Sequence, residues 1–310
     1  MVRVRYSFGC RHTGRIENIK KQRGKFPDVM KDVVRISDIV LEILDARFIE
    51  ETRNLEAEKD VDKQGKKLVY IFNKCDLVDV KDLEKQIPSW MRPYVFVSAT
   101  KGVGLRDLKA RIKMEAKRIL AGWKNSEDTE IQNRKKIHVG VIGYPNTGKS
   151  SVINFISRRG AAKTSKQAGF TKGMQKIRMS EDILILDTPG VIPNSEYSSE
   201  SKSFAKDVKV GARTYSDVKN PEDVVYYLIS ASTPKDENNL TDEEQAAIEE
   251  AERNSEAIEK FYEVKADGSV EVLIEELGKK KGFLGKGGKI DVDRTARLIL
   301  RDWQSGAIRV

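Results

Sequence analysis

The chain contains few of the residues that mark disulfide-rich and metal-binding proteins. Its 310 residues include two cysteines, Cys10 and Cys75, and two histidines. The cysteines form no CxxC motif and no spacing typical of metal ligands, which argues against a disulfide framework or a zinc site. A reducing compartment is therefore expected.

Long apolar stretches are also missing. No run approaches the roughly 18 residues that a membrane helix needs, and residues 1–27 lack the apolar core of a signal peptide. We therefore expect a cytoplasmic protein that does not enter a membrane. The N-terminal segment is rich in arginine and poor in acids, which leaves an organellar transit peptide as the alternative.

Acidic residues are outnumbered by basic ones. The chain has 57 Lys and Arg against 48 Asp and Glu, a net charge of +9. Because no lipidation signal or basic amphipathic anchor accompanies this charge, the expected partner is nucleic acid rather than a membrane. A Lys- and Glu-rich soluble or thermophilic protein that happens to be basic would have a similar composition.

Apolar strand patterns and helical patterns alternate over residues 28–200. The helical pattern is clearest in "LRDLKARIKMEAKRIL", residues 105–120. Strand-like runs occur at Ile39–Leu44, Leu68–Phe72, Tyr94–Ser98, Ile137–Ile142, Gln175–Met179 and Ile183–Asp187. Strands rich in Val, Ile and Leu predict an α/β fold, with a doubly wound, mostly parallel six-stranded sheet covered by helices on both faces.

Three parts are predicted along the chain. They are a basic N-terminal segment (1–27), the α/β domain (28–200) and a smaller helical C-terminal domain (201–310). Helical periodicity in residues 242–262 and 293–303 indicates the last of these. The polar residues 121–136 interrupt the alternation of the α/β domain and are predicted to be a linker.

The stretch "GYPNTGKS", residues 143–150, fits the phosphate-binding motif G-x-x-x-x-G-K-[ST] without a gap. A strand-like run precedes it and a helical run follows, which is the context that this P-loop motif requires. Backbone N–H groups and the helix N-terminus would surround the phosphates. Lys149 is predicted to bridge the β- and γ-phosphates, and the Ser150 hydroxyl to ligate Mg²⁺. Further phosphate-binding candidates are Tyr144, Pro145, Asn146, Thr147, Gly148 and Ser151.

The stretch "ILILDTPG" places a carboxylate and a glycine after an apolar strand. Asp187 is predicted to lie at the Mg²⁺ ion, and the Gly190 N–H near the γ-phosphate. The loop "AGFTKG" offers Thr171 as a second hydroxyl for the metal, unless it is an ordinary loop threonine. Lys149, Thr171 and Gly190 are the candidate catalytic residues.

The tetrapeptide "NKCD", residues 73–76, follows another apolar strand and has the form of a guanine-reading motif. Asp76 is predicted to accept hydrogen bonds from the guanine N1–H and amine, which adenine cannot offer. Asn73 would tie the segment to the phosphate loop, and Lys74 would lie over the base. A last motif, "SAT", supplies Ser98, Ala99 and Thr100, with the Ala99 N–H facing guanine O6. Together these motifs predict a GTP site; Asp76 argues against the alternative of an ATPase or kinase.

The guanine motifs precede the phosphate motifs in this chain, the reverse of the usual order. Joining neighbouring chain ends and cutting elsewhere can leave a compact fold intact. The order of motifs resembles the circularly permuted GTPases of the YlqF/RbgA ribosome-assembly family, as do residues 44–54, 144–154 and 279–306. This resemblance implies a circularly permuted GTPase that binds large ribosomal subunit precursors through ribosomal RNA.

One catalytic part is missing from the motifs. Val191 stands where many GTPases carry a glutamine that orients water, so slow intrinsic hydrolysis stimulated by a partner is expected. The resemblance suggests His12 as a substitute, although His12 is also readily explained as a surface or RNA-contacting residue. Asn146 is the candidate K⁺ ligand. The alternative function is an RNA-binding scaffold that uses GTP as a structural ligand without significant turnover.

Basic residues are concentrated near both ends of the chain. In the final helical stretch Ala296, Ile299, Leu300 and Trp303 form an apolar stripe that is predicted to be core. The candidate RNA-contacting residues are Lys279, Lys280, Lys281, Lys286, Lys289, Arg294, Arg297 and Arg301. An ordinary solvated charged face is the alternative interpretation. The expected state in solution is a monomer.

Overall fold

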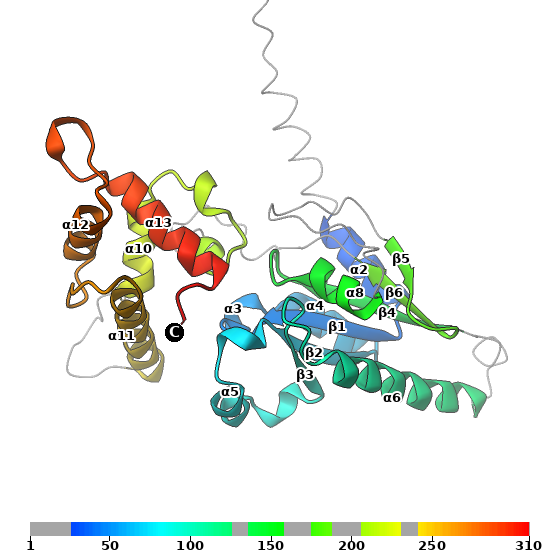
Figure 1. The fold of residues 1–310 in the computed structure, drawn as a ribbon. Helices are drawn as coiled ribbons and strands as arrows, with labels where there is room; N and C mark the ends of the chain where they lie inside the picture. The colour runs from blue at the N-terminus through cyan, green and yellow to red at the C-terminus, as the bar shows by residue number, and fades with distance from the viewer. Residues whose placement is uncertain (1–25, 126–135, 158–174, 188–205, 231–240, 310) are drawn as a thin grey trace, which may run out of the picture.

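The computed structural model describes residues 26–125, 136–157, 175–187, 206–230 and 241–309. The predicted domain boundary at residue 200 and most of the predicted N-terminal segment lie outside these ranges. Figure 1 shows two parts, a sheet covered by helices and a group of helices beside it. We call the described residues 26–187 the sheet region and residues 206–309 the helical region.

Six strands form one sheet in the order β3-β2-β1-β4-β6-β5. Neighbouring strands are parallel except β5 and β6, which are antiparallel. The strands are β1 (Ile39–Asp45), β2 (Lys67–Asn73), β3 (Tyr94–Val97), β4 (Ile137–Gly143), β5 (Gln175–Arg178) and β6 (Ile183–Asp187). The predicted mostly parallel six-stranded sheet is confirmed, and each predicted strand is found within one residue of its expected ends.

Helices cover both faces of the sheet, because side chains of a strand alternate between the faces. Ile39, Leu41 and Ile43 of β1 pack in one core with α6 (Leu105–Lys124) and α8 (Lys149–Ser157). Val40 packs on the other face with α2 (Phe26–Ile36) and α4 (Leu55–Lys63). The predicted doubly wound arrangement is confirmed. The shorter elements are α3 (Ile49–Thr52), η1 (Cys75–Leu77), α5 (Val80–Gln86) and η2 (Ser89–Met91).

Helix α6 is longer than its predicted pattern. It continues from Leu120 to Lys124, so the predicted linker cannot begin at residue 121. The reason is that Trp123, like Leu120, packs against the core beneath the helix. The remaining linker residues 126–135 lie outside the described residues.

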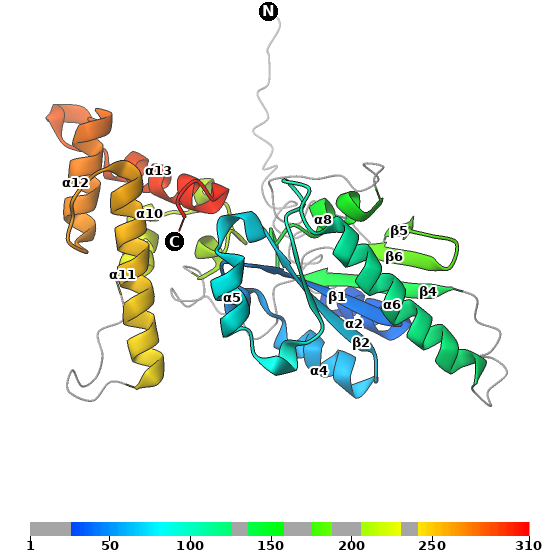
Figure 2. The ribbon, with the colours of Figure 1, turned by 60° about the horizontal axis from the view of Figure 1, so that its bottom comes forward.

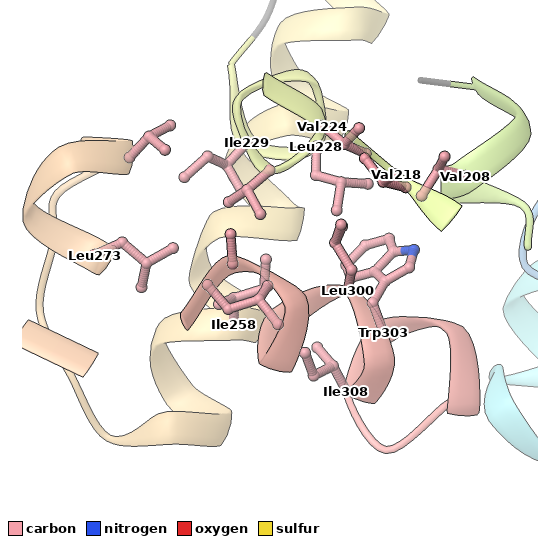
Figure 3. Close-up of a cluster of buried hydrophobic side chains, with 14 of the residues drawn as sticks. Val208, Val218, Val224, Leu228, Ile229, Ile258, Leu273, Leu300, Trp303 and Ile308 are labelled. Atoms are coloured by element: carbon pink, nitrogen blue, oxygen red, sulfur yellow. The ribbon is translucent and has the colours of Figure 1, made fainter. Parts of the chain in front are cut away.

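The helical region has a second apolar core, which also includes Phe48 and Tyr144 of the sheet region and which Figure 3 shows around Trp303. The predicted apolar stripe of α13 is confirmed, since Ala296, Ile299, Leu300 and Trp303 are all buried. The elements are η4 (Tyr215–Asp217), α10 (Pro221–Ile229), α11 (Asp242–Tyr262), α12 (Val270–Lys281), η5 (Lys286–Gly288) and α13 (Val292–Ser305).

Three of the candidate RNA-contacting residues stand at the end of a helix. Lys279, Lys280 and Lys281 are the last turn of α12. Cations are favourable at a helix C-terminus because of the partial negative charge there. The helix ends where Gly282 adopts a left-handed conformation with φ of 66°.

Candidate functional site

The motif residues meet at one edge of the sheet, because the carboxyl ends of parallel strands lie together there. In the strand register Asp45 pairs with Asn73, and Asn73 with Val97. Ile43 pairs with Gly143, where the P-loop begins. The structure thus brings the guanine motifs and the phosphate motif to the same edge, although about 70 residues separate them in sequence.

Asn73 joins three of the predicted loops. Its amide Nδ2 donates to the Thr147 carbonyl at 2.8 Å, and its Oδ1 accepts from the Ala99 N–H at 3.3 Å. A Cβ atom on Gly148 would lie 2.2 Å from Asn73 Nδ2, and Gly148 has φ of +94°. Only glycine allows this close approach. The predicted tie between the "NKCD" segment and the phosphate loop is present in the structure.

Asp76 lies in η1, directly after the left-handed residue Lys74 with φ of 63° and Cys75. Its Oδ1 atom is buried and has no hydrogen-bond partner among the described residues. A buried acceptor without a donor costs free energy on the order of 1–3 kcal/mol. A ligand with two adjacent N–H donors, as on the guanine edge, would satisfy this carboxylate.

The loop after β3 is held by its own hydrogen bonds. Ser98 is fully buried and exchanges two backbone hydrogen bonds with Val103, each 3.1 Å long. The Ser98 Oγ lies 3.3 Å from the Thr100 hydroxyl and accepts from the Lys101 N–H at 3.2 Å. These contacts hold the Ala99 N–H next to Asn73, three residues before Asp76 in the chain.

The P-loop closes around its lysine. Lys149 is 6% exposed, and its Nζ donates to the carbonyls of Gly143 at 2.9 Å and Tyr144 at 2.8 Å. Thr147 is buried and donates from its hydroxyl to the Tyr144 carbonyl at 2.9 Å. The helix α8 starts at Lys149, so Ser150 and Ser151 stand in its first turn. A helix start with free N–H groups is a favourable position for phosphate.

Several predicted site residues lie outside the described residues. They are His12, Thr171 and Gly190, together with Val191. Asp187 ends β6 at the predicted edge, but only its backbone is described. Of the predicted Mg²⁺ ligands, Ser150 alone has a described side chain, and the described residues hold no cluster of three His, Cys, Asp or Glu side chains.

Asp45 is a site residue that the motif analysis missed. It is fully buried at the end of β1, and its Oδ2 accepts from Lys74 Nζ at 2.6 Å. Arg47 binds the same carboxylate through Nε at 3.0 Å and through its terminal nitrogen at 2.8 Å. Burial alone would raise the pKa of Asp45, but Lys74 and Arg47 outweigh burial and hold the pKa well below its ordinary value. An aspartate that ends an apolar strand, as Asp187 does, was the available sequence signal.

The helical region contacts Arg47, which binds the Asp45 carboxylate. Arg47 donates to the Trp303 carbonyl at 3.1 Å, near the end of α13, where carbonyls lack helical partners. The rings of Phe48 and Trp303 stack with their centroids 6.1 Å apart. The Trp303 indole N–H donates to the Lys209 carbonyl at 3.2 Å. Lys74 of the guanine motif is therefore linked through Asp45 and Arg47 to the core of the helical region.

A second contact reaches the P-loop. The Tyr144 hydroxyl donates to Asp207 Oδ1 at 2.7 Å, and Tyr144 is fully buried. The Asn146 amide Nδ2 donates to the Gly211 carbonyl. Arg213 in turn pairs with Asp207 at 3.0 Å. The helical region thus touches both the guanine side and the phosphate side of the candidate site.

Most of the candidate RNA-contacting residues are engaged within the chain. Lys279 pairs with Glu275 and Glu276, and Arg301 with Asp302. Arg297 pairs with Asp293 and also donates to backbone carbonyls between residues 215 and 218.

The other candidates differ among themselves. Lys280 pairs with Glu263, the Lys281 Nζ lies 5.9 Å from the ring centroid of Tyr262, and Arg294 lies 4.1 Å from that of Phe283. Lys289 is exposed, and the side chain of Lys286 is outside the described residues.

Residues 138–262 match the family model described as 50S ribosome-binding GTPase. An uncharacterized GTP-binding protein of Methanocaldococcus jannaschii is 32% identical over 280 residues, which cover 90% of this chain and 65% of that protein. The nuclear GTP-binding protein NUG1 of Saccharomyces cerevisiae is 30% identical over 94% of this chain and 56% of its own length. The nucleolar GTP-binding protein 2 of Yarrowia lipolytica is 29% identical over 93% of this chain and 51% of its own length.

Two solved structures of YlqF share the fold. One is bound to GDP, and the other, from T. maritima, is bound to GNP. Each has a TM-score of 0.57, at 21% and 22% identity, and each covers more than 90% of this chain and 96% of its own. The family match begins at β4, after the guanine motifs, which agrees with a permuted order. The predicted resemblance to the circularly permuted GTPases is confirmed. The chain spans between half and two thirds of the length of the curated relatives named above.

No helix within the described part of the chain is long and apolar enough to cross a membrane.

Proposed function

Because the chain has the circularly permuted GTPase fold of YlqF and is similar to nuclear and nucleolar GTP-binding proteins, we propose that it is a GTP-hydrolysing switch. It acts on precursors of the large ribosomal subunit, which it binds through ribosomal RNA. The cytoplasmic location and the monomeric state expected from the sequence are part of this proposal. The observation that carries it is the buried Asp76 Oδ1, an acceptor for which the described residues offer no donor, in a loop that Asn73 ties to the P-loop.

Guanine recognition rests on Asp76. Its carboxylate accepts from the guanine N1–H and amine, and the Ala99 N–H, which is shared with Asn73 Oδ1 at 3.3 Å, donates to O6. Adenine offers neither donor, and such a buried, preset site rejects the wrong base on the order of 10⁴-fold. The salt bridge from Lys74 to Asp45 holds the lysine stem in place beside the base.

Hydrolysis uses the P-loop and the segments that carry Thr171 and Gly190. Lys149 neutralises the β- and γ-phosphates, and the Gly190 N–H contacts the γ-phosphate. The oxygen atoms of Ser150, Thr171 and Asp187 form the donor set that Mg²⁺ prefers. The bound ion would stabilise charge that develops on the phosphates.

The rate of hydrolysis depends on groups beyond the P-loop. Val191 cannot orient water, so intrinsic turnover is slow, with His12 as the candidate substitute and ribosomal particles as the activator. Asn146 donates from Nδ2 to Gly211, which leaves its Oδ1 as the candidate K⁺ ligand. Turnover should therefore be faster in KCl than in NaCl.

Asp76→Asn tests the proposal. The asparagine amide donates where the aspartate accepted, so GTP affinity should fall at least about 100-fold, the loss of two hydrogen bonds to a charged group. Xanthosine triphosphate, which has a carbonyl in place of the guanine amine, should become the preferred nucleotide. Titration of both nucleotides by fluorescence measures this, with Asp82→Asn on exposed α5 as the control. Unchanged preference for GTP in Asp76→Asn would refute the site.

A further inference from the structure

An unassigned basic surface runs along α6. It consists of Arg106, Lys113, Lys117 and Lys124, all of them exposed. At about 100° per residue these side chains fall within about 40° of helical arc, and they extend over about 27 Å at 1.5 Å per residue. We call this surface the α6 basic stripe. Figure 2 shows α6 along the outside of the sheet region.

The four cations of the stripe have no acidic partner in the described ranges of the chain. None of the four residues has a carboxylate within 4.0 Å in the part of the chain that the structure describes. One of the two acids of the same helix, Glu115, is 3% exposed and binds Arg111 at 3.4 Å and Arg118 at 3.3 Å on the opposite edge. The helix therefore separates two paired arginines from a line of cations that have no acidic partner among the described residues.

An ordinary solvated helix face looks different. On α4 the exposed Lys59 and Lys63 stand among Glu56, Asp60 and Asp62, so both signs of charge are interspersed. The α6 basic stripe contains no acid, and Asp107 lies towards the edge that carries Arg111 and Arg118. A single-sign line of this kind creates a local positive potential that attracts polyanions.

The chemistry of the stripe selects the kind of polyanion. Proteins that bind single strands stack the bases on exposed aromatic rings. The stripe has no aromatic member, and Trp123 next to it packs against the core. A straight helix with cations in line instead suits contacts to the phosphate backbone, through which double-helical RNA is recognised. We propose that the α6 basic stripe binds the backbone of double-helical RNA.

The stripe also lies next to the nucleotide site. Helix α6 begins at Leu105, shortly after the Ser98–Thr100 loop, and the exposed Lys101 lies between them. Gly104 caps the helix with φ of +79°, and a Cβ there would lie 2.1 Å from the Phe96 carbonyl oxygen of β3. This close approach fixes the start of α6 against the strand that leads to the guanine loop. RNA bound at the Arg106 end of the stripe would therefore lie near the Ser98–Thr100 loop.

The proposal rests on the proposed function for its RNA partner, and a matched pair of double variants tests it. Lys113→Ala/Lys117→Ala removes two charges of the stripe, and Lys59→Ala/Lys63→Ala removes two exposed charges of α4 at the same spacing. Binding of a 20-base-pair RNA duplex to the full chain is measured by fluorescence anisotropy between 0.05 and 0.3 M KCl. Each phosphate contact contributes a slope of about −0.9 to the logarithmic salt dependence. The stripe variant should lose about 10- to 100-fold in affinity at 0.1 M KCl. The slope of its logarithmic salt dependence should become less steep by about two.

The control variant should change the affinity less than about twofold. Equal losses in both variants would mean that only net charge matters, and an unchanged stripe variant would mean that RNA binds elsewhere; either result overturns the proposal. Poly-L-glutamate that competes with the duplex equally well, charge for charge, would instead indicate an acidic protein partner and overturn it too. A wild-type chain that binds no duplex at all would refute the RNA-binding part of the proposed function itself.

Discussion

The sheet region and the helical region contribute to the candidate site in different ways. In the sheet region the groups with chemistry follow strand ends, and short motifs identify them. In the helical region the groups that reach the site belong to no motif: Trp303 through its carbonyl, and Asp207 through its carboxylate. The difference teaches that the chemistry of the pocket is local in sequence, whereas the packing that holds its loops comes from residues that are 63 to 256 positions away along the chain.

The strongest test of this comparison is to replace Trp303, the tryptophan at the contact between the regions. Trp303 is 2% exposed and Trp123, which packs on the sheet core, is partly buried. Trp303→Ala should lower the free energy of unfolding by about 3–5 kcal/mol, because it leaves a cavity and removes the stacking on Phe48. Trp123→Ala should cost about 1–2 kcal/mol. Urea denaturation measures both.

A difference in nucleotide binding would sharpen the comparison further. Trp303→Ala keeps the backbone carbonyl that accepts from Arg47, but loss of the indole should loosen the end of α13 that carries this carbonyl. The Asp45–Lys74 pair is then held less firmly, and GDP binding should weaken. Trp123→Ala should leave GDP affinity unchanged. If Trp303→Ala unfolds the helical region without any change in GDP affinity, the helical region does not support the pocket and the comparison fails.

Replacement of Asp45, whose carboxylate binds Arg47 at the contact between the two regions, should give the next largest effect on stability. Asp45→Asn leaves Arg47 and Lys74 without their buried counter-charge, so we expect a loss of about 3 kcal/mol at pH 7. The pKa of Asp45 is lowered in the folded protein, so its contribution is present above the unfolded value of about 3.8 and is lost as the pH falls below it. The gap between wild type and Asp45→Asn should therefore narrow below about pH 4 in urea denaturation.

Glu42, three residues earlier in β1, is the control of opposite sign. It is fully buried, and burial together with the nearby Glu58 raises its pKa. Its neutral form is favoured in the folded state, so the wild type loses stability as the pH rises above the unfolded pKa of this glutamate. Glu42→Gln should lack that loss and gain on the wild type from pH 5 to pH 8. If both variants changed with pH in the same direction, the two sites would not differ as the contacts require.

Sequence reasoning found what depends on local pattern. The strands, the P-loop and "NKCD" follow from apolar runs and fixed spacings, and the Asn73–Thr147 contact follows from the chemistry of that motif. Asp45 was missed because its importance comes from Lys74 and Arg47, whose side chains meet it only in the folded chain. The end of α6 was missed because the pattern of Ala121 and Gly122 is weak and the packing of Trp123 decides it.

Charge counting does not distinguish paired from unpaired cations, for a related reason. Arg297 and Lys113 look alike in sequence, each in a basic helix with apolar residues at helical spacing. The structure gives Arg297 an acidic partner and three backbone carbonyls, while Lys113 has no carboxylate within 4.0 Å among the described residues. Whether a cation is committed inside the protein depends on residues about 80 positions away, which no local pattern encodes.

The smallest expected effect on stability comes from comparing two arginines of α13, Arg297 with its internal hydrogen-bond partners and Arg294 on the surface. Arg297→Ala should lower the free energy of unfolding by about 2 kcal/mol, because the carbonyls of η4 lose a charged donor. Arg294→Ala, which removes an exposed guanidinium that lies over Phe283, should cost about 0.5 kcal/mol. Chemical denaturation and RNA duplex affinity are measured on both variants. If Arg297 serves to hold α13 and η4 together, Arg297→Ala should change stability and leave RNA affinity within about twofold after correction for net charge. The reverse result, lost RNA affinity at full stability, would show that Arg297 exchanges its internal partners for phosphate and that the helical region, like α6, carries the RNA.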